Sequence, residues 1–268
     1  MSEFTKRVLF AICAAPLFVL IIWVGGFLFI AVMLLVGLLI QRELIHLLDI
    51  QGFRPNATIS YLSLVILMGG VVFQEYLAAS FVGVALIQIS VDTLEKNRRQ
   101  MYRIMSTMFC TVYPALGVLS FVGIRELGSM PQDGYGLLLI LLFMIWANDS
   151  MAYFVGKNFG RHLMAPHLSP KKTWEGFAGG FIGSGLGLLA ATYFVPVEGY
   201  SFAETWPLIF VISIVGPIGD LTASKIKRAA GVKDTSTLIP GHGGVLDRFD
   251  SLLLSAPVMF LYLRYLVF

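Results

Sequence analysis

The chain has 268 residues, of which 57% are hydrophobic and only 13% are charged. This composition excludes an ordinary water-soluble domain and predicts a protein that lies mostly within a membrane. The formal net charge of +3 gives no support for nucleic acid as a partner. Cys13 and Cys110 lie in apolar runs with no second ligand nearby, so neither a disulfide framework nor a zinc site is expected.

Apolar runs of membrane-spanning length recur along the whole chain and predict an all-α, polytopic integral membrane protein with about nine transmembrane helices. In chain order we expect helices at residues 8–24, 27–41, 57–73, 76–90, 104–123, 135–155, 176–195, 206–219 and 252–267. Gly25 and Gly26 divide the first two, although residues 8–40 could also form one long tilted span. Residues 1–103 are expected to form an N-terminal transmembrane part, and residues 104–268 a C-terminal catalytic region.

Basic residues are unevenly distributed over the loops and predict the orientation. If the loops after even-numbered helices share a side with the N-terminus, that side carries every Lys and Arg except Arg125 and Arg264. By the positive-inside rule the N-terminus is then inside and the C-terminus outside, in the cell inner (cytoplasmic) membrane. Lys6 and Arg7 before an apolar run also resemble a signal peptide, a less favoured alternative because no clear cleavage site follows.

The seventh expected helix carries two stripes of small residues. Gly179, Gly183 and Gly187 recur every four positions, and Gly176, Gly180 and Ser184 lie beside them. Small residues at this spacing let another helix approach closely. Packing within the chain is the favoured interpretation, and the seam of a homodimer is the alternative.

Two loops expected at the cytoplasm, 156–175 and 220–251, contain the groups that could do chemistry. Asp220 is expected at the inner end of its helix, while Asp247 and Asp250 are three positions apart where the last helix begins. Three carboxylates should therefore converge at the membrane surface. Such hard oxygen ligands suit Mg²⁺, which bridges protein carboxylates to substrate phosphates.

Between these acids lie groups that bind phosphate. Glycines let backbone N–H groups approach an anion closely, and basic side chains supply positive charge. The segment contains Lys225, Lys227, Arg228 and Lys233, followed by Pro240, Gly241, His242, Gly243 and Gly244. Each piece alone has a plainer role, such as a helix cap, a topology signal or a turn. Together they indicate phosphoryl or nucleotidyl transfer.

A second cluster runs from the sixth helix into the following loop. Asp149 is a functional candidate because an ionisable residue within an apolar span is costly. Residues 169–175 are expected to open the seventh helix, where free N–H groups with Lys171 and Lys172 would bind an anion. A further polar group on the second helix, formed by Arg42, Glu43, His46 and Asp49, is expected to pair mutually or to contact lipid headgroups.

At these residues the chain resembles the CDP-diacylglycerol synthases, also called phosphatidate cytidylyltransferases. The signature of this family reads S-x-hydrophobic-K-R, four residues, K-D, then P-x-H-G-G-hydrophobic-x-D-R-hydrophobic-D. Every named position is filled here, by Ser224, Lys227, Arg228, Lys233, Asp234, Pro240, His242, Gly243, Gly244, Asp247, Arg248 and Asp250. The segment from Asp149 through Tyr153 to residues 169–176 resembles a second block shared by the family.

The resemblance implies that CTP and phosphatidic acid give CDP-diacylglycerol and pyrophosphate, with Mg²⁺ required. Asp220 and Asp247 would hold the metal, and Asp250 and Asp149 would be further ligands or supports. The implied catalytic residues are Asp220, Asp247, Asp250, Lys227 and Arg228. The implied substrate-binding residues are Asp149, Lys171, Lys172, Ser224, Lys233, Gly241, His242, Gly243, Gly244 and Arg248.

Three other functions stay open from the sequence. The enzyme could act on another lipid phosphate, such as a polyprenyl phosphate. An ion- or proton-coupled transporter could use Asp149 and Asp220 as membrane carboxylates, although these acids are expected near span ends. A membrane anchor or assembly subunit would bind no nucleotide.

Overall fold

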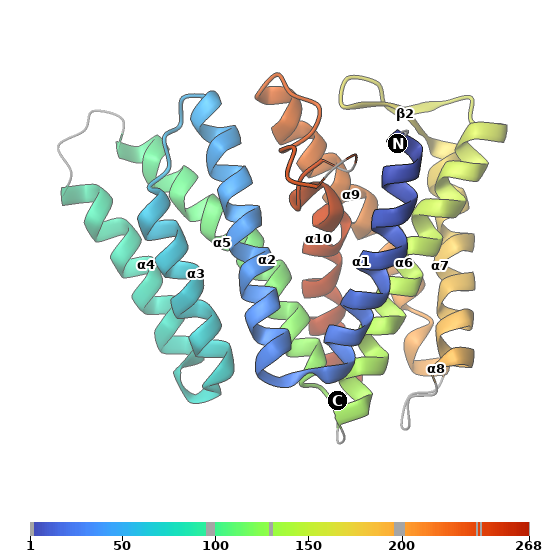
Figure 1. Cartoon of the computed structure of the whole chain (residues 1–268), viewed down its shortest axis with the longest axis horizontal. Helices are drawn as coiled ribbons and strands as arrows, with labels where there is room; N and C mark the ends of the chain where they lie inside the picture. Colours follow the sequence, from blue (N-terminus) through green and yellow to red (C-terminus); the bar gives the residue numbers. More distant parts are fainter. Residues whose placement is uncertain are drawn as a thin grey trace.

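Long helices make up most of the chain in the computed structural model (Figure 1). They are α1 (Glu3–Val24), α2 (Gly26–Ile50), α3 (Ala57–Val72), α4 (Leu77–Leu94), α5 (Gln100–Arg125), α6 (Pro131–Phe159), α7 (Trp174–Phe194), α9 (Leu208–Ala229) and α10 (Leu246–Tyr262). Shorter elements are the 3-10 turn Gln74–Tyr76, α8 (Phe202–Thr205) and the π-helical turn Leu263–Val267. The structure describes residues 3–94, 100–128, 131–195, 202–239, 241 and 243–267.

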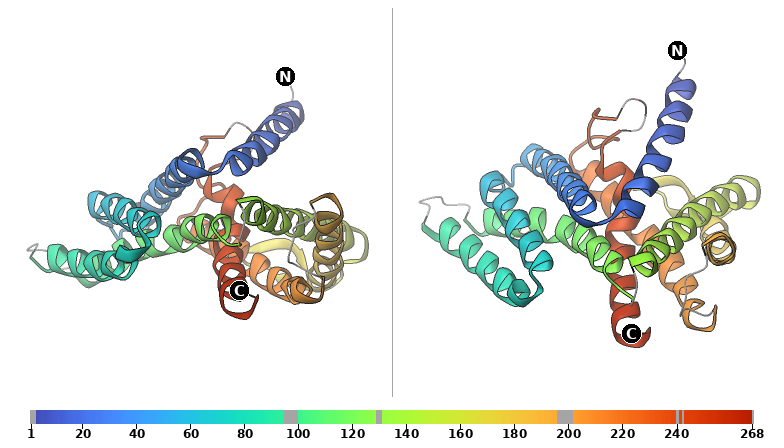
Figure 2. Two further views of the ribbon diagram at one scale, coloured as in Figure 1. Left: turned by 90° about the horizontal axis from the view of Figure 1, so that it is seen from below. Right: turned by 60° about the horizontal axis from the view of Figure 1, so that its bottom comes forward.

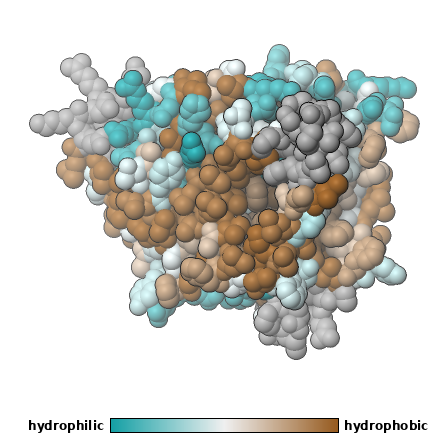
Figure 3. All heavy atoms as spheres, in the orientation of Figure 1, coloured by the Kyte–Doolittle hydropathy of each residue, from teal (hydrophilic) through white to brown (hydrophobic). Residues whose placement is uncertain are grey.

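A polytopic membrane protein is confirmed by the length and composition of the helices. Among the described residues, seven helices are long and apolar enough to cross a membrane, and the shorter apolar stretches Ile12–Val24 and Ala57–Val72 lie in α1 and α3. In the space-filling view, apolar residues form a broad band between more polar ends (Figure 3). The count of about nine spans stays a prediction.

The loops predicted to share one side do lie at one end of the bundle. The N-terminal end of α1, the α2–α3 and α6–α7 connections and the segment after α9 lie at the top of Figure 1. The C-terminal end of the chain lies at the opposite end. The distribution of basic residues predicted this arrangement, while the assignment of the top to the cytoplasm remains a prediction.

Gly25 separates α1 from α2, so the alternative of one continuous span over residues 8–40 is wrong. Gly25 and Gly26 have φ values of 64° and 53°, which favour glycine. Arg125 of α5 satisfies the end of α1, because its Nε donates to the Ile22 carbonyl oxygen at 2.9 Å. A Cβ at residue 25 would lie only 2.6 Å from Arg125 Nη2.

The predicted loop 220–251 is wrong at both of its ends. The helix α9 continues past residue 219 to Ala229, and α10 begins at Leu246 rather than at residue 252. Residues 220–229 lack an apolar run, but their burial follows the helical period, since Ala223 and Lys227 are buried while Lys225 is exposed. The connection between the two helices is therefore residues 230–245.

A β-hairpin occupies part of the predicted loop 156–175, which is a small exception to the all-α prediction. Its strands are β1 (Leu163–Ala165) and β2 (Ser169–Thr173), paired antiparallel with Leu163 opposite Thr173 and Ala165 opposite Ser169. The expectation that residues 169–173 open the seventh helix is wrong. Pro170 disfavours a helical conformation at the residue before it, and the Thr173 side chain caps α7 by accepting from Gly176 N at 3.1 Å.

The glycine stripe of α7 packs against α6, which confirms packing within the chain. A Cβ at Gly179 would lie 2.7 Å from the Val155 side chain, and one at Gly183 would overlap the Ala147 carbonyl oxygen. Gly187 is packed in the same way against the backbone of α6. The stripe is therefore occupied inside the chain and is not the seam of a dimer.

Helix α10 lies near the middle of the bundle, between α5 and α9. Seen from below, α3 and α4 lie at one edge, and α6, α7 and α9 lie toward the opposite edge (Figure 2). Helix α10 packs against α5 on one side and α9 on the other. Next to it, Asn148 Nδ2 of α6 donates to Gly180 O of α7 at 2.9 Å and to Ser184 Oγ at 3.0 Å. These buried contacts fix the helices that surround the site described below.

Candidate active site

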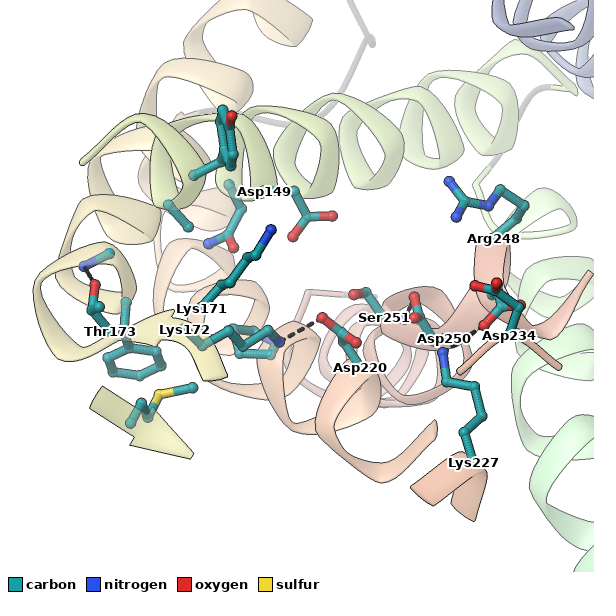
Figure 4. A pocket seen from close by; sticks show the side chains of 18 residues that line it. Asp149, Lys171, Lys172, Thr173, Asp220, Lys227, Asp234, Arg248, Asp250 and Ser251 are labelled. Atoms are coloured by element: carbon teal, nitrogen blue, oxygen red, sulfur yellow. Dashed lines mark hydrogen bonds and ion pairs between the residues drawn. The ribbon is translucent and has the colours of Figure 1, made fainter. Parts of the chain in front are cut away.

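A cavity of about 460 Å³ opens at the top of the bundle among α6, α7, α9, α10 and the hairpin (Figure 4). Eight of the predicted site residues line it: Asp149, Lys171, Lys172, Asp220, Lys227, Asp247, Arg248 and Asp250. The two clusters found in the sequence therefore form one site, which contains both acidic and basic side chains.

Asp220 connects helix α9 to the hairpin. Its Oδ2 lies 2.5 Å from Lys172 Nζ of β2, and its Oδ1 accepts from Ser224 Oγ at 3.3 Å. The Asp220 side chain is 33% exposed and that of Lys172 is 26% exposed, so both remain accessible from the cavity. Arg228, two turns further along α9, does not pair with Asp220 and donates to the Val232 carbonyl oxygen at 3.0 Å.

Asp247 forms a more deeply buried ion pair on the other side of the cavity. Its Oδ1 lies 2.5 Å from Lys227 Nζ, with side-chain exposures of 5% and 11%. Its Oδ2 accepts from Thr235 N at 2.8 Å, Thr235 Oγ1 at 2.9 Å and Gly244 N at 2.9 Å. Asp247 thus fixes the loop between α9 and α10 while its charge is balanced by Lys227.

Asp149, Asp220 and Asp250 face a common space, into which Lys171 also points (Figure 4). The Asp250 side chain is fixed by the backbone of the following residue, because its Oδ1 accepts from Ser251 N at 2.7 Å. Neither Lys171 nor Arg248 makes an ion pair within the described parts of the chain, so both can bind an incoming anion. Asp220 and Asp247, which come from different helices, line the same cavity.

The donor chemistry of the cavity fits a hard divalent cation. Asp220 accepts one contact at each oxygen, and Asp247 Oδ1 accepts only from Lys227, so these oxygens keep lone pairs. Within the described ranges, no group of three or more acids, histidines or cysteines is arranged so that it could hold a metal ion by itself. Mg²⁺ often uses one or two carboxylates and completes its shell with water and phosphate oxygens. Asp220 and Asp247 therefore have carboxylate oxygens that could hold such a cation only together with ligands from outside the protein.

Some predicted residues lie apart from the cavity. Ser224 supports Asp220, whereas Arg228 and Lys233 are exposed beyond the cavity wall. Gly241 and Gly243 belong to the loop between α9 and α10, both with positive φ, and Gly244 packs inside it. His242, predicted to bind substrate, lies outside the described residues, as does Pro240.

The role of Glu43 on α2 was not predicted from the sequence. The expectation that it pairs with Arg42, His46 or Asp49 is wrong. The Glu43 carboxylate is buried and accepts hydrogen bonds from Thr235, Ser236, Val245 and Leu246. The available signal was a carboxylate in a largely apolar helix, where a charge needs specific partners. The apolar walls of the cavity, Met164, Phe177 and Pro217, were also missed, since nothing in their local sequence marks them.

The chain is similar to known proteins over almost its whole length. Residues 5–266 match the cytidylyltransferase family. The chain is 33% identical over 260 residues to a phosphatidate cytidylyltransferase of Staphylococcus aureus, covering 94% of this chain and 96% of the relative. It is also 33% identical over 263 residues to the phosphatidate cytidylyltransferase of Staphylococcus haemolyticus, with the same coverage.

Proposed function

The chain belongs to the cytidylyltransferase family, and we propose that it transfers the cytidylyl group of CTP to phosphatidic acid, giving CDP-diacylglycerol and pyrophosphate. The observation that carries this function is the match to the family across residues 5–266, together with relatives of this activity that align over nearly their full length. The charged cavity supplies the chemistry that such a transfer requires.

In the proposed reaction, an oxygen of the phosphatidic acid phosphate attacks the α-phosphorus of CTP. The bond between the α-phosphorus and the oxygen bridging to the β-phosphorus breaks, and pyrophosphate leaves with that oxygen. No side-chain nucleophile is needed, because the lipid phosphate is itself largely ionised near neutral pH. Positioning of the two phosphates and neutralisation of their charge should therefore supply most of the rate enhancement.

We assign the basic side chains of the cavity to the phosphates of the two substrates. Lys171 and Arg248 can bind these phosphates directly. The side chains of Lys172 and Lys227 can exchange their contacts with Asp220 and Asp247 for contacts with phosphate oxygens. This role is supported by the strength of charge-assisted hydrogen bonds from lysine and arginine to phosphate. Arg228, grouped with them by the sequence, does not line the cavity.

Asp220 and Asp247 would hold Mg²⁺, with Asp250 and Asp149 as additional ligands or supports. When bound, the metal would neutralise charge on the triphosphate. The proposal is supported by the lone pairs that Asp220 and Asp247 keep and by the acids that face the same space. Lys172 and Lys227 balance the charges of these two acids. When the lysine side chains move to phosphate oxygens, the carboxylates of Asp220 and Asp247 become available to the metal.

The proposed setting is the cell inner membrane, with the cavity facing the cytoplasm and the N-terminus inside. This setting is supported by the cluster of basic residues at the end of the bundle where the cavity opens. CTP would arrive from the cytoplasm, while the acyl chains of phosphatidic acid stay among the membrane lipids. A homodimer remains a prediction, without support from the α7 glycine stripe.

Pyrophosphate release by the purified protein tests the function, with CTP, phosphatidic acid and Mg²⁺ each omitted in turn. We expect release only when all three are present. Faster release with a polyprenyl phosphate than with phosphatidic acid would favour the other lipid substrate. Transport of an ion or solute by reconstituted protein, without pyrophosphate release from CTP, would instead support the transporter.

A further inference from the structure

Glu43 lies on α2, outside the helices that form the cavity, yet its carboxylate is buried against the loop between α9 and α10. The residue is 5% exposed. Its Oε1 accepts from Ser236 Oγ at 2.7 Å and from Val245 N at 2.9 Å. Its Oε2 accepts from Thr235 Oγ1 at 2.7 Å and from Leu246 N at 2.8 Å. Four donors therefore satisfy a charge that would otherwise be costly to bury.

These four hydrogen bonds join the two ends of one loop. Thr235 and Ser236 lie in the first half of the connection from α9, whereas Val245 is the N-cap of α10 and Leu246 its first residue. The first N–H groups of a helix lack partners within the helix, and a carboxylate is stabilising there. Gly244 leaves no spare room, because a Cβ at this position would overlap Thr235 Oγ1 and both Glu43 oxygens.

The same cluster reaches the cavity through Thr235. The Thr235 hydroxyl lies 2.7 Å from Glu43 Oε2 and 2.9 Å from Asp247 Oδ2. Since a hydroxyl has a single proton, it donates to one of these carboxylates at a time. Glu43 and Asp247 thus contact the same residue of the loop, and Asp247 in turn accepts from Lys227.

We propose that Glu43 is a positioning residue for the transfer site: its carboxylate fixes residues 235–236 and 245–246 so that Asp247, Lys227 and Arg248 are aligned for substrate phosphates. The inference rests on the proposed function, although Glu43 touches no substrate in it. Without this carboxylate the loop and the first turn of α10 lose a shared acceptor. Misplacement of binding groups by about 1 Å can lower a rate about 100-fold.

The first test compares Glu43→Gln with Asp49→Asn. Both substitutions convert a carboxylate to an amide on α2, but the exposed Asp49 side chain makes no hydrogen bond or ion pair with the described residues. We expect Glu43→Gln to lower kcat by about 10- to 100-fold at saturating CTP and phosphatidic acid. Amide hydrogen exchange at residues 244–246 should also accelerate at least about 10-fold. Asp49→Asn should change neither quantity.

A second pair keeps the inference testable if Glu43→Gln does not fold. Thr235→Val removes the hydroxyl that bridges Glu43 and Asp247, whereas Thr235→Ser retains it. We expect Thr235→Val to lower kcat and to accelerate exchange at residues 244–246, and Thr235→Ser to restore both toward the values of the unaltered protein. A Glu43→Gln variant with kcat within twofold of the unaltered protein would overturn the inference, as would equal behaviour of the two Thr235 variants.

The two readouts separate this inference from the proposed function. If the unaltered protein releases no pyrophosphate from CTP, the proposed transfer fails, while hydrogen exchange still decides whether Glu43 fixes the loop. If pyrophosphate is released but exchange at residues 244–246 is the same in Glu43→Gln, the positioning role fails alone.

Discussion

At the scale of single residues, the two proposed metal ligands differ in burial, so their substitution should have different costs. Asp220→Asn weakens a half-accessible pair with Lys172 and should cost under about 1 kcal/mol of stability. Asp247→Asn leaves the buried Lys227 without its counter-charge and should cost about 3–5 kcal/mol. Thermal unfolding in detergent measures this difference.

Both variants should nevertheless lose Mg²⁺-dependent pyrophosphate release, because each removes a proposed ligand of the metal. Activity has to be compared at a temperature where Asp247→Asn is still folded. Near-normal turnover in both variants would remove Asp220 and Asp247 from the metal site.

The lack of space for a side chain at Gly244 leads to a second prediction for single residues. Replacement of Gly244 by Ala forces a methyl group between Thr235 and Glu43, so we expect a loss of about 1–3 kcal/mol of stability and at least a tenfold loss of activity. Gly69→Ala is the matched control, because a Cβ there meets nothing within 4 Å. Equal thermal unfolding and turnover of the two alanine variants would contradict the close packing of Gly244 against Thr235 and Glu43.

At the scale of elements, the close approach of α6 and α7 sets the position of Asp149 and of the hairpin. A methyl group at Gly183 would overlap the Ala147 carbonyl oxygen, so Gly183→Ala should push the helices apart and cost about 1–3 kcal/mol. At Gly185 the nearest atom to a Cβ is Ile209 Cδ1 at 3.8 Å, an ordinary contact. Gly185→Ala should therefore unfold at the temperature of the unaltered protein, and a similar loss in both variants would contradict the packing argument.

The positions of the helices were predictable because a span needs about 20 apolar residues, which composition reveals. Their ends were less predictable where polar residues continue a helix, as in residues 220–229 of α9. The expected places of Asp220 at the end of one helix and Asp247 at the start of another predicted that the two would share a site, and both line the cavity. Glu43 was not predictable in its role, because its partners are 192 to 203 positions away and no local pattern identifies them.

At the scale of the whole molecule, the orientation of the protein in the membrane can be tested, because the loops predicted to face the cytoplasm lie at one end of the bundle. We expect a thiol at His167→Cys, in the hairpin, to react with a membrane-impermeant maleimide only when the inner face is accessible. Glu126 directly follows the C-terminal residue of α5, and this end of α5 lies opposite the hairpin, so a thiol at Glu126→Cys should react in intact cells. Both variants require replacement of the exposed Cys13, whereas Cys110 is buried. The reverse labelling pattern would contradict the inward N-terminus.

The most direct measurement of the central claim is transfer of label from CTP that carries a radioactive α-phosphorus. With purified protein, phosphatidic acid and Mg²⁺, the label should move into a lipid-soluble product in a one-to-one ratio with released pyrophosphate. Asp220→Asn should abolish both. Pyrophosphate release while the label remains in water-soluble CMP, or no release at all, would contradict cytidylyl transfer to the lipid at this cavity.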